Sequence, residues 1–193
     1  MTETPTVSAL LTAMREIDDR GGLRFEDVSL SWRQHVQRSH DRAALLRALL
    51  DPDRPRHFGI LMDNVPEFSL LLGGAAFSGS VVVGLNTTRR GDALARDIAL
   101  ADCQVVFTEQ AHAGLLEGLD LGDVRVIDVD SPEWAELLAP HRDSIPEVAE
   151  VSPDDLFMLI FTSGTSGDPK AVRCTHAKIA APGRMLAQRS ASA

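Results

Sequence analysis

Cysteine is scarce in this chain, and the little there is forms no pattern. Cys103 and Cys174 are the only cysteines among 193 residues, and they lie far apart in the sequence. Two distant cysteines argue against a disulfide scaffold or a zinc site. Basic residues are absent from Met1 to Ser8, so the amino terminus does not resemble a signal peptide. Both absences predict a protein of the reducing cytoplasm.

Lysine is scarce as well. Lys170 and Lys178 are the only lysines among nineteen basic residues, and the formal net charge is −9. Acidic residues crowd the stretch from Asp97 to Asp155, and none follows Asp168. Because nucleic-acid binding needs an extended basic face, the short basic tail excludes nucleic acid as an expected partner.

One stretch, Phe68 to Asn86, lacks charge altogether. A run of about 18 apolar residues is a candidate membrane span. This one contains several glycines and serines and ends in the β-branched run Val81-Val82-Val83. A buried helix that turns into a buried strand explains the composition better, so we expect no transmembrane span.

The remaining pattern alternates between strand and helix periodicity. An amphipathic helix is expected near the amino terminus, followed by a hairpin around Phe25 and Leu30 and a helix that Ser31 caps. Further strands are expected at His57–Met62, Ser80–Leu85, Cys103–Thr108, Val124–Val129 and Leu156–Phe161, with helices at Pro66–Phe77, Gly91–Ala101, Glu109–Gly118 and Ser131–Leu138. This alternation predicts an α/β fold with a mainly parallel sheet flanked by helices.

The most informative motif follows the last of these strands. A loop rich in glycine and hydroxyl groups leads to a lysine, and its candidate nucleotide-binding residues are Thr162, Ser163, Gly164, Thr165, Ser166, Gly167 and Lys170. Glycines let backbone N–H groups close around phosphate oxygens, hydroxyls add donors, and lysine adds a compact positive charge. The loop is not a Walker A motif, because no Gly-Lys-Ser/Thr stands at the required spacing. The motif therefore predicts a polyphosphate site.

This loop resembles the phosphate loop of the adenylate-forming superfamily, the AMP-binding acyl-CoA synthetases. Ser166 stands where threonine is usual and Ala171 where glycine is usual. Weaker resemblance to fatty-acid–CoA ligases extends over most of the chain, including Leu30–Arg33, His57–Phe68 and Gly79–Asn86. The likeness implies the amino-terminal part of the large domain of such an enzyme.

The resemblance also implies a reaction. Family members join a carboxylic acid to ATP with Mg²⁺, giving an acyl-adenylate, and coenzyme A then displaces AMP. A fatty acid is the implied substrate class. The family's later motifs have no counterpart in residues 1–193, so the chain is expected to be an incomplete AMP-binding domain that is inactive alone. No catalytic residue and no metal ligand is assigned. An exposed sheet edge is expected to favour self-association.

Two other functions remain open at this stage. The chain could be a truncated, non-catalytic remnant or an interaction module, or, less well supported, a phosphate-loop kinase. Histidines 35, 40, 57, 112 and 141 show no ligand spacing and are interpreted as surface or packing residues, and His176 as a helix-entry residue. Asp63 and Asn64 fit either a polar site contact or an Asx turn.

Overall fold

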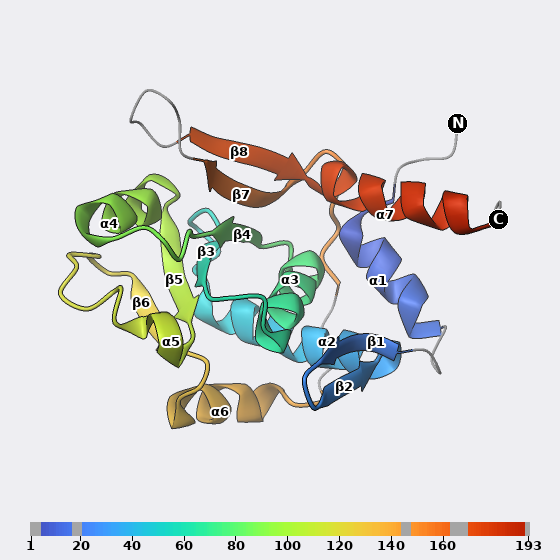
Figure 1. The fold of residues 1–193 in the computed structure, drawn as a ribbon, viewed down its shortest axis with the longest axis horizontal. Helices are drawn as coiled ribbons and strands as arrows, with labels where there is room; N and C mark the ends of the chain where they lie inside the picture. The colour runs from blue at the N-terminus through green and yellow to red at the C-terminus, as the bar shows by residue number, and fades with distance from the viewer. Residues whose placement is uncertain (1–4, 17–20, 144–147, 163–169, 192–193) are drawn as a thin grey trace.

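The computed structural model describes residues 5–16, 21–143, 148–162 and 170–191, with backbone only at 162, 170 and 184–191. Its centre is a six-stranded sheet with the strand order β6-β5-β3-β4-β7-β8 (Figure 1). The strands are β3 (His57–Leu61), β4 (Val81–Gly84), β5 (Cys103–Thr108), β6 (Arg125–Asp128), β7 (Leu156–Thr162) and β8 (Lys170–Thr175). All neighbours pair in parallel except β7 and β8, which confirms the predicted α/β class.

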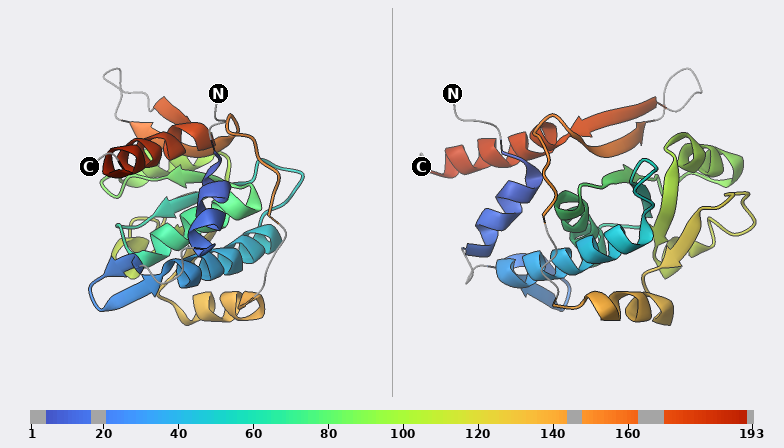
Figure 2. Two further views of the ribbon diagram at one scale, coloured as in Figure 1. Left: turned by 90° about the vertical axis from the view of Figure 1, so that its right-hand side faces the viewer. Right: turned by 180° about the vertical axis from the view of Figure 1, so that it is seen from behind.

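Helices occupy both faces of the sheet. They are α1 (Val7–Glu16), α2 (Trp32–Leu49), α3 (Pro66–Ser78), α4 (Gly91–Leu100), α5 (Gln110–Ala113), α6 (Pro132–Leu138), the 3₁₀ turn η1 (Ala139–His141) and α7 (His176–Ala191). The predicted hairpin around Phe25 and Leu30 is formed by β1 (Gly21–Phe25) and β2 (Val28–Ser31). It lies against α2. Figure 2 shows α1 and α7 side by side at one end of the molecule, where both chain termini lie.

Two apolar cores separate along the faces of the sheet. In one, α2, α3 and α6 pack on Phe58, Val82 and Phe107. In the other, α4 packs Leu94 and Ile98 against alternate residues of the same strands. Burial on both faces explains why β3, β4 and β5 are almost continuously apolar.

Small residues bring α2 and α3 together. A Cβ atom at Gly73 would stand 2.2 Å from Oγ of Ser39, so only glycine permits this approach. The uncharged stretch thus forms α3 and β4 inside the domain, as predicted. None of the helices that the structure describes combines the length and the apolar composition that a membrane span requires.

Two local expectations need correction. The helix expected at Glu109–Gly118 is α5 alone, followed by turns, because Gly114 weakens helix propagation and Gly118 adopts a left-handed φ of 71°. The antiparallel strand β8 was not expected, and it makes Lys170, the last residue of the predicted phosphate loop, part of the sheet.

Candidate functional site

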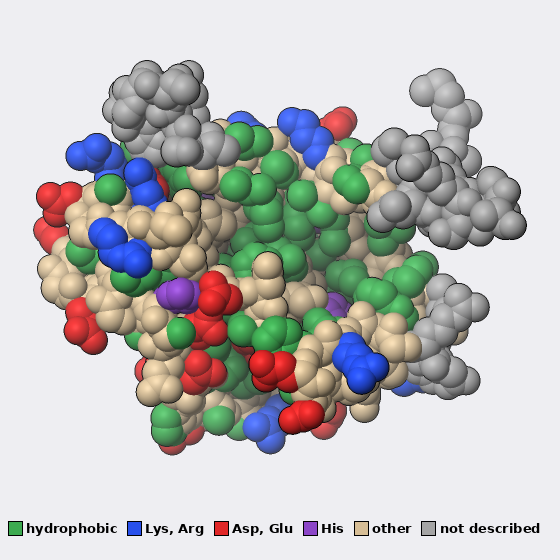
Figure 3. Space-filling model, viewed as in Figure 1, with side chains coloured by type: hydrophobic (Ala, Val, Ile, Leu, Met, Phe, Trp, Pro, Cys, Tyr) green, Lys and Arg blue, Asp and Glu red, His purple; other side chains and the backbone are tan. Residues whose placement is uncertain are grey.

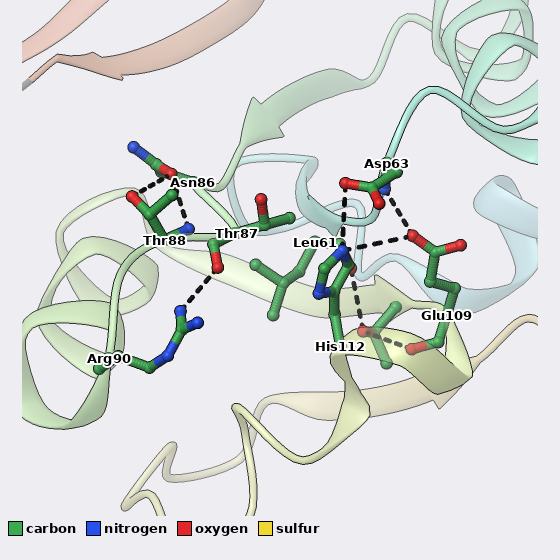
Figure 4. Close-up of polar contacts among 9 residues, drawn as sticks. Leu61, Asp63, Asn86, Thr87, Thr88, Arg90, Glu109 and His112 are labelled. Carbon is green, nitrogen blue, oxygen red and sulfur yellow. Dashed lines mark hydrogen bonds and ion pairs between the residues drawn. The ribbon is translucent and has the colours of Figure 1, made fainter.

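The carboxyl ends of the parallel strands form one polar edge of the sheet. Asp63 follows β3, Asn86 follows β4 and Glu109 follows β5 (Figure 4). Nucleotide sites of α/β proteins lie outside such an edge, where loops leave the strands. This edge is therefore the candidate functional site.

The predicted phosphate loop starts from the same edge. β7 ends at Thr162 and β8 begins at Lys170, and these two residues are Cα partners in the antiparallel pair. Ser163, Gly164, Thr165, Ser166 and Gly167 lie outside the described residues. Thr162 and Lys170 are described by their backbone alone, so the assignment of all seven residues to a nucleotide stays a prediction.

The loop after β4 is fixed by its own side chains. Oδ1 of Asn86 accepts hydrogen bonds from the backbone N–H and the hydroxyl of Thr88, at 2.8 and 2.7 Å. Arg90 donates to the carbonyl of Thr87 at 2.6 Å (Figure 4). Asn86 thus forms an Asx turn at this edge, as Asp128 does at the end of β6, where its Oδ1 accepts the N–H of Asp130 at 2.9 Å.

Arg89, in the same loop after β4, forms a structural ion pair with Asp97. Its guanidinium donates to both oxygens of Asp97, at 2.8 and 2.9 Å. The Asp97 side chain is only 1% exposed. A bidentate pair with a buried carboxylate anchors the Asn86 loop to α4 and leaves Arg89 engaged with protein.

A cluster of two carboxylates and one imidazole lies at the ends of β3 and β5. Nε2 of His112 is 3.2 Å from Oδ1 of Asp63 and 3.6 Å from Oε1 of Glu109. Oε1 of Glu109 also accepts the backbone N–H of Asp63 at 2.6 Å. We call Asp63, Glu109 and His112 the edge cluster (Figure 4).

The sequence alone did not single out the edge cluster. His112 was interpreted as a surface or packing residue because no ligand stands near it at a recognised spacing. One local signal existed: Glu109 and His112 are three positions apart at a helix start, which places them on one face. Asp63 could join them only once β3 and β5 were known to be neighbours.

Three other histidines and Cys103 are packing residues. His35, His40 and His176 are buried, and desolvation lowers the pKa of each, to about 4 for His40. His176 begins α7, as expected. Burial raises the pKa of the Cys103 thiol to about 12, which keeps it an inert core residue.

The AMP-binding enzyme family matches residues 11–191 of this chain. The chain is 53% identical over 190 residues to the medium/long-chain-fatty-acid–CoA ligase FadD17 of Mycobacterium tuberculosis, a match that covers 98% of this chain and 37% of the relative. It is 43% identical over 166 residues to the steroid-22-oyl-CoA synthetase of Rhodococcus jostii, covering 84% of this chain and 30% of that one.

Solved structures support the fold. The structure of VinN with 3-methylaspartate superposes with a TM-score of 0.77 at 28% identity, over 92% of this chain and 49% of that one. The anthranilate CoA ligase AuaEII in complex with anthranoyl-AMP gives a TM-score of 0.77 at 19% identity, over 92% of this chain and 35% of that chain. The chain thus spans little more than a third of the length of the mycobacterial relative and less than half of these solved chains.

Proposed function

Because the chain belongs to the AMP-binding enzyme family, we propose that it supplies the ATP phosphate loop of an ATP-dependent acid–CoA ligase. The observation that carries the proposal is the 53% identity to a medium/long-chain-fatty-acid–CoA ligase over 98% of the chain. In this reaction a carboxylate attacks the α-phosphate of ATP, and coenzyme A then takes the acyl group from the adenylate.

The phosphate loop has one task in this proposal. The hydroxyls of Thr162, Ser163, Thr165 and Ser166, the backbone N–H groups at Gly164 and Gly167, and the ammonium group of Lys170 bind the β- and γ-phosphates. Holding these phosphates orients pyrophosphate as the leaving group of the first half-reaction. A bound Mg²⁺ ion would neutralise part of the phosphate charge, and the oxygen-rich chemistry of the loop is compatible with that ion.

The topology of β7 and β8 supports this role. The two strands bracket residues 163–169 at the carboxyl edge of the parallel sheet, the edge at which α/β proteins bind nucleotides. A lysine among seventeen arginines is also the compact cation suited to a phosphate.

The substrate class follows from the relatives. Identity to the medium/long-chain-fatty-acid–CoA ligase is 53%, against 43% for the steroid-22-oyl-CoA synthetase. We therefore expect a medium- or long-chain fatty acid, handled together with the part of the enzyme that residues 1–193 do not include.

A chimeric enzyme tests the proposal. Residues 1–193 replace the matching segment of the mycobacterial FadD17 ligase, and ATP–pyrophosphate exchange is measured with a long-chain fatty acid. The chimera should be active, and Lys170→Ala should slow adenylate formation roughly ten- to a hundredfold, since one charge-assisted contact contributes about 1.5–3 kcal/mol. Thioester formation from preformed acyl-adenylate should change little, because pyrophosphate leaves only in the first step.

The controls separate binding from folding. Lys178→Ala removes the only other lysine, whose ammonium group donates to the carbonyl of Arg173 at 3.1 Å, and should leave exchange unchanged. The 193-residue chain alone should release no pyrophosphate above background. Equal losses in both half-reactions for Lys170→Ala would contradict the phosphate role, and an inactive, folded chimera would favour a non-catalytic module.

A further inference from the structure

We infer that the edge cluster of Asp63, Glu109 and His112 is a binding site for a divalent transition-metal ion, zinc in the first instance. Among the described residues, this is the set in which ligand atoms of three His, Cys, Asp or Glu side chains all lie within 4.8 Å of one another. The site is distinct from any magnesium ion that accompanies ATP, because an imidazole nitrogen is a poor ligand for Mg²⁺ and a good one for Zn²⁺.

The backbone fixes the positions of the three side chains. β3 and β5 are neighbouring parallel strands in which Leu61 and Thr108 are Cα partners. Oγ1 of Thr108 donates to the carbonyl of Leu61 at 2.9 Å, directly before the cluster. Such links hold the two strand ends in register. Strand pairing therefore places the three side chains close together at the edge of the sheet (Figure 4).

The spacing of the ligand atoms fits a shared ion. With metal–ligand bonds of about 2.1 Å, neighbouring ligand atoms stand about 3.0–3.4 Å apart in octahedral or tetrahedral coordination. Nε2 of His112 is 3.2 Å from Asp63 and 3.6 Å from Glu109. The ligand atoms of all three residues lie within 4.8 Å of one another. Rotation of the mostly exposed Asp63 side chain can therefore bring them around one centre.

The second observation is that a ring nitrogen of His112 has no hydrogen-bond partner in the part of the chain that the structure describes. Nε2 of His112 is shielded from solvent and has no hydrogen-bond partner, although two carboxylate oxygens are close to it. In a hydrogen bond the acceptor lies near the N–H axis. Two ligands of one metal lie off that axis by about 35–45°, because the ion itself occupies the axis. Because no hydrogen bond between described residues uses Nε2 of His112, this nitrogen is available to an ion that the two carboxylates share.

The cluster also has an open side. The side chain of Asp63 is 68% exposed, whereas those of Glu109 and His112 are 12% and 18% exposed. An ion can enter beside Asp63, and water can complete its coordination. Three protein ligands and an open position form a common zinc arrangement. Glu109 keeps its second role, since its Oε1 also accepts the N–H of Asp63.

Isothermal titration of the metal-free 193-residue chain with zinc chloride tests the site. One zinc ion should bind per chain, and magnesium chloride should give no such heat. His112→Gln and Asp63→Asn should each weaken zinc binding at least tenfold. Asp63→Asn is the safer variant for folding because this side chain is mostly exposed, and circular dichroism verifies the fold of both.

Matched variants exclude other sites. Asp92→Asn changes an exposed carboxylate of α4, and Cys174→Ser removes the half-buried thiol; both should keep the affinity of the unaltered chain. A ¹⁵N spectrum of the histidine rings should show zinc moving the Nε2 signal of His112. The proposal is wrong if the chain does not bind zinc, or if Asp63→Asn binds zinc as tightly as the unaltered chain does. It is also wrong if Nε2 of His112 stays protonated when zinc is added. The edge cluster would then be an ion pair and not a metal site.

Discussion

The backbone N–H of Val7 donates a hydrogen bond to Nδ1 of His176 over 3.3 Å, across 169 positions of sequence. His176 is 1% exposed and its ring lies 4.9 Å from that of Phe157. Burial lowers the pKa of His176, which keeps the ring neutral and Nδ1 free to accept, while Asp155 opposes that shift in part. One imidazole thus joins the start of α1 to the start of α7.

Replacing His176 by phenylalanine should release α1. The new ring keeps the contact with Phe157 but cannot accept the N–H of Val7, so we expect a loss of about 1–2 kcal/mol in the free energy of unfolding. Urea denaturation measures the loss, and hydrogen exchange should accelerate in the first turn of α1 before it does in α3. Unchanged exchange at Val7 would contradict this role.

Acid should destabilise the fold through its buried histidines. Burial lowers the pKa of His40 from 6.5 to about 4, and that of His35 is also lowered. Below pH 6.5 these histidines bind protons in the unfolded chain but not in the folded chain. Their contribution to the free energy of unfolding is therefore fully present above pH 6.5 and is lost as the pH falls towards 4. Urea midpoints should therefore decrease from pH 7.5 to pH 5.5. His40→Gln should flatten this dependence.

Arg89 and Asp97 should behave as a unit. Removing Arg89 leaves the carboxylate of Asp97, 1% exposed, without its charge partner. Since Arg89 is 30% exposed and water can reach part of the gap, we expect Arg89→Ala to cost about 2 kcal/mol, below the range for fully buried pairs. Arg90→Ala, which loses only bonds to loop carbonyls, should cost under about 1 kcal/mol. Equal costs in thermal denaturation would contradict the pairing.

The β7–β8 pair should make the 193-residue chain self-associate. Ile160 and Val172 are Cα partners on these strands and are 39% and 44% exposed. The space-filling view shows a hollow lined by hydrophobic side chains on one face of the molecule (Figure 3). We expect light scattering to detect oligomers and the dye ANS to bind. Changing Ile160 and Val172 to threonine should reduce both signals, whereas Leu100→Thr on α4, 63% exposed, should not. A monodisperse chain that binds no dye would contradict the expectation.

Local patterns in the sequence were enough for the class of fold. Apolar residues recur with a period of two in strands and of about 3.6 in helices, so neighbouring residues are enough to detect both patterns. The residues that begin and end each helix or strand are also local signals. Ser31 caps α2 as expected, and the structure adds a capping box with Gln34. Gly79, with φ of 69°, ends α3 as a left-handed cap. The phosphate-loop motif is local in the same sense, since all its residues lie between positions 162 and 170.

Strand order was decided by tertiary structure alone. The order of the strands depends on how the helices bury both faces of the sheet. This packing involves residues far apart in the sequence, so a short stretch of sequence does not reveal it. The order β5-β3-β4 brings Asp63 to Glu109 across 46 positions, and with it His112. The antiparallel return of β8 has the same origin, because its backbone N–H and C=O groups find their partners only once β7 is in place. The sequence by itself determined most of the helices and strands and the phosphate-loop motif. Packing decided the place of β8 and which polar side chains share the edge of the sheet.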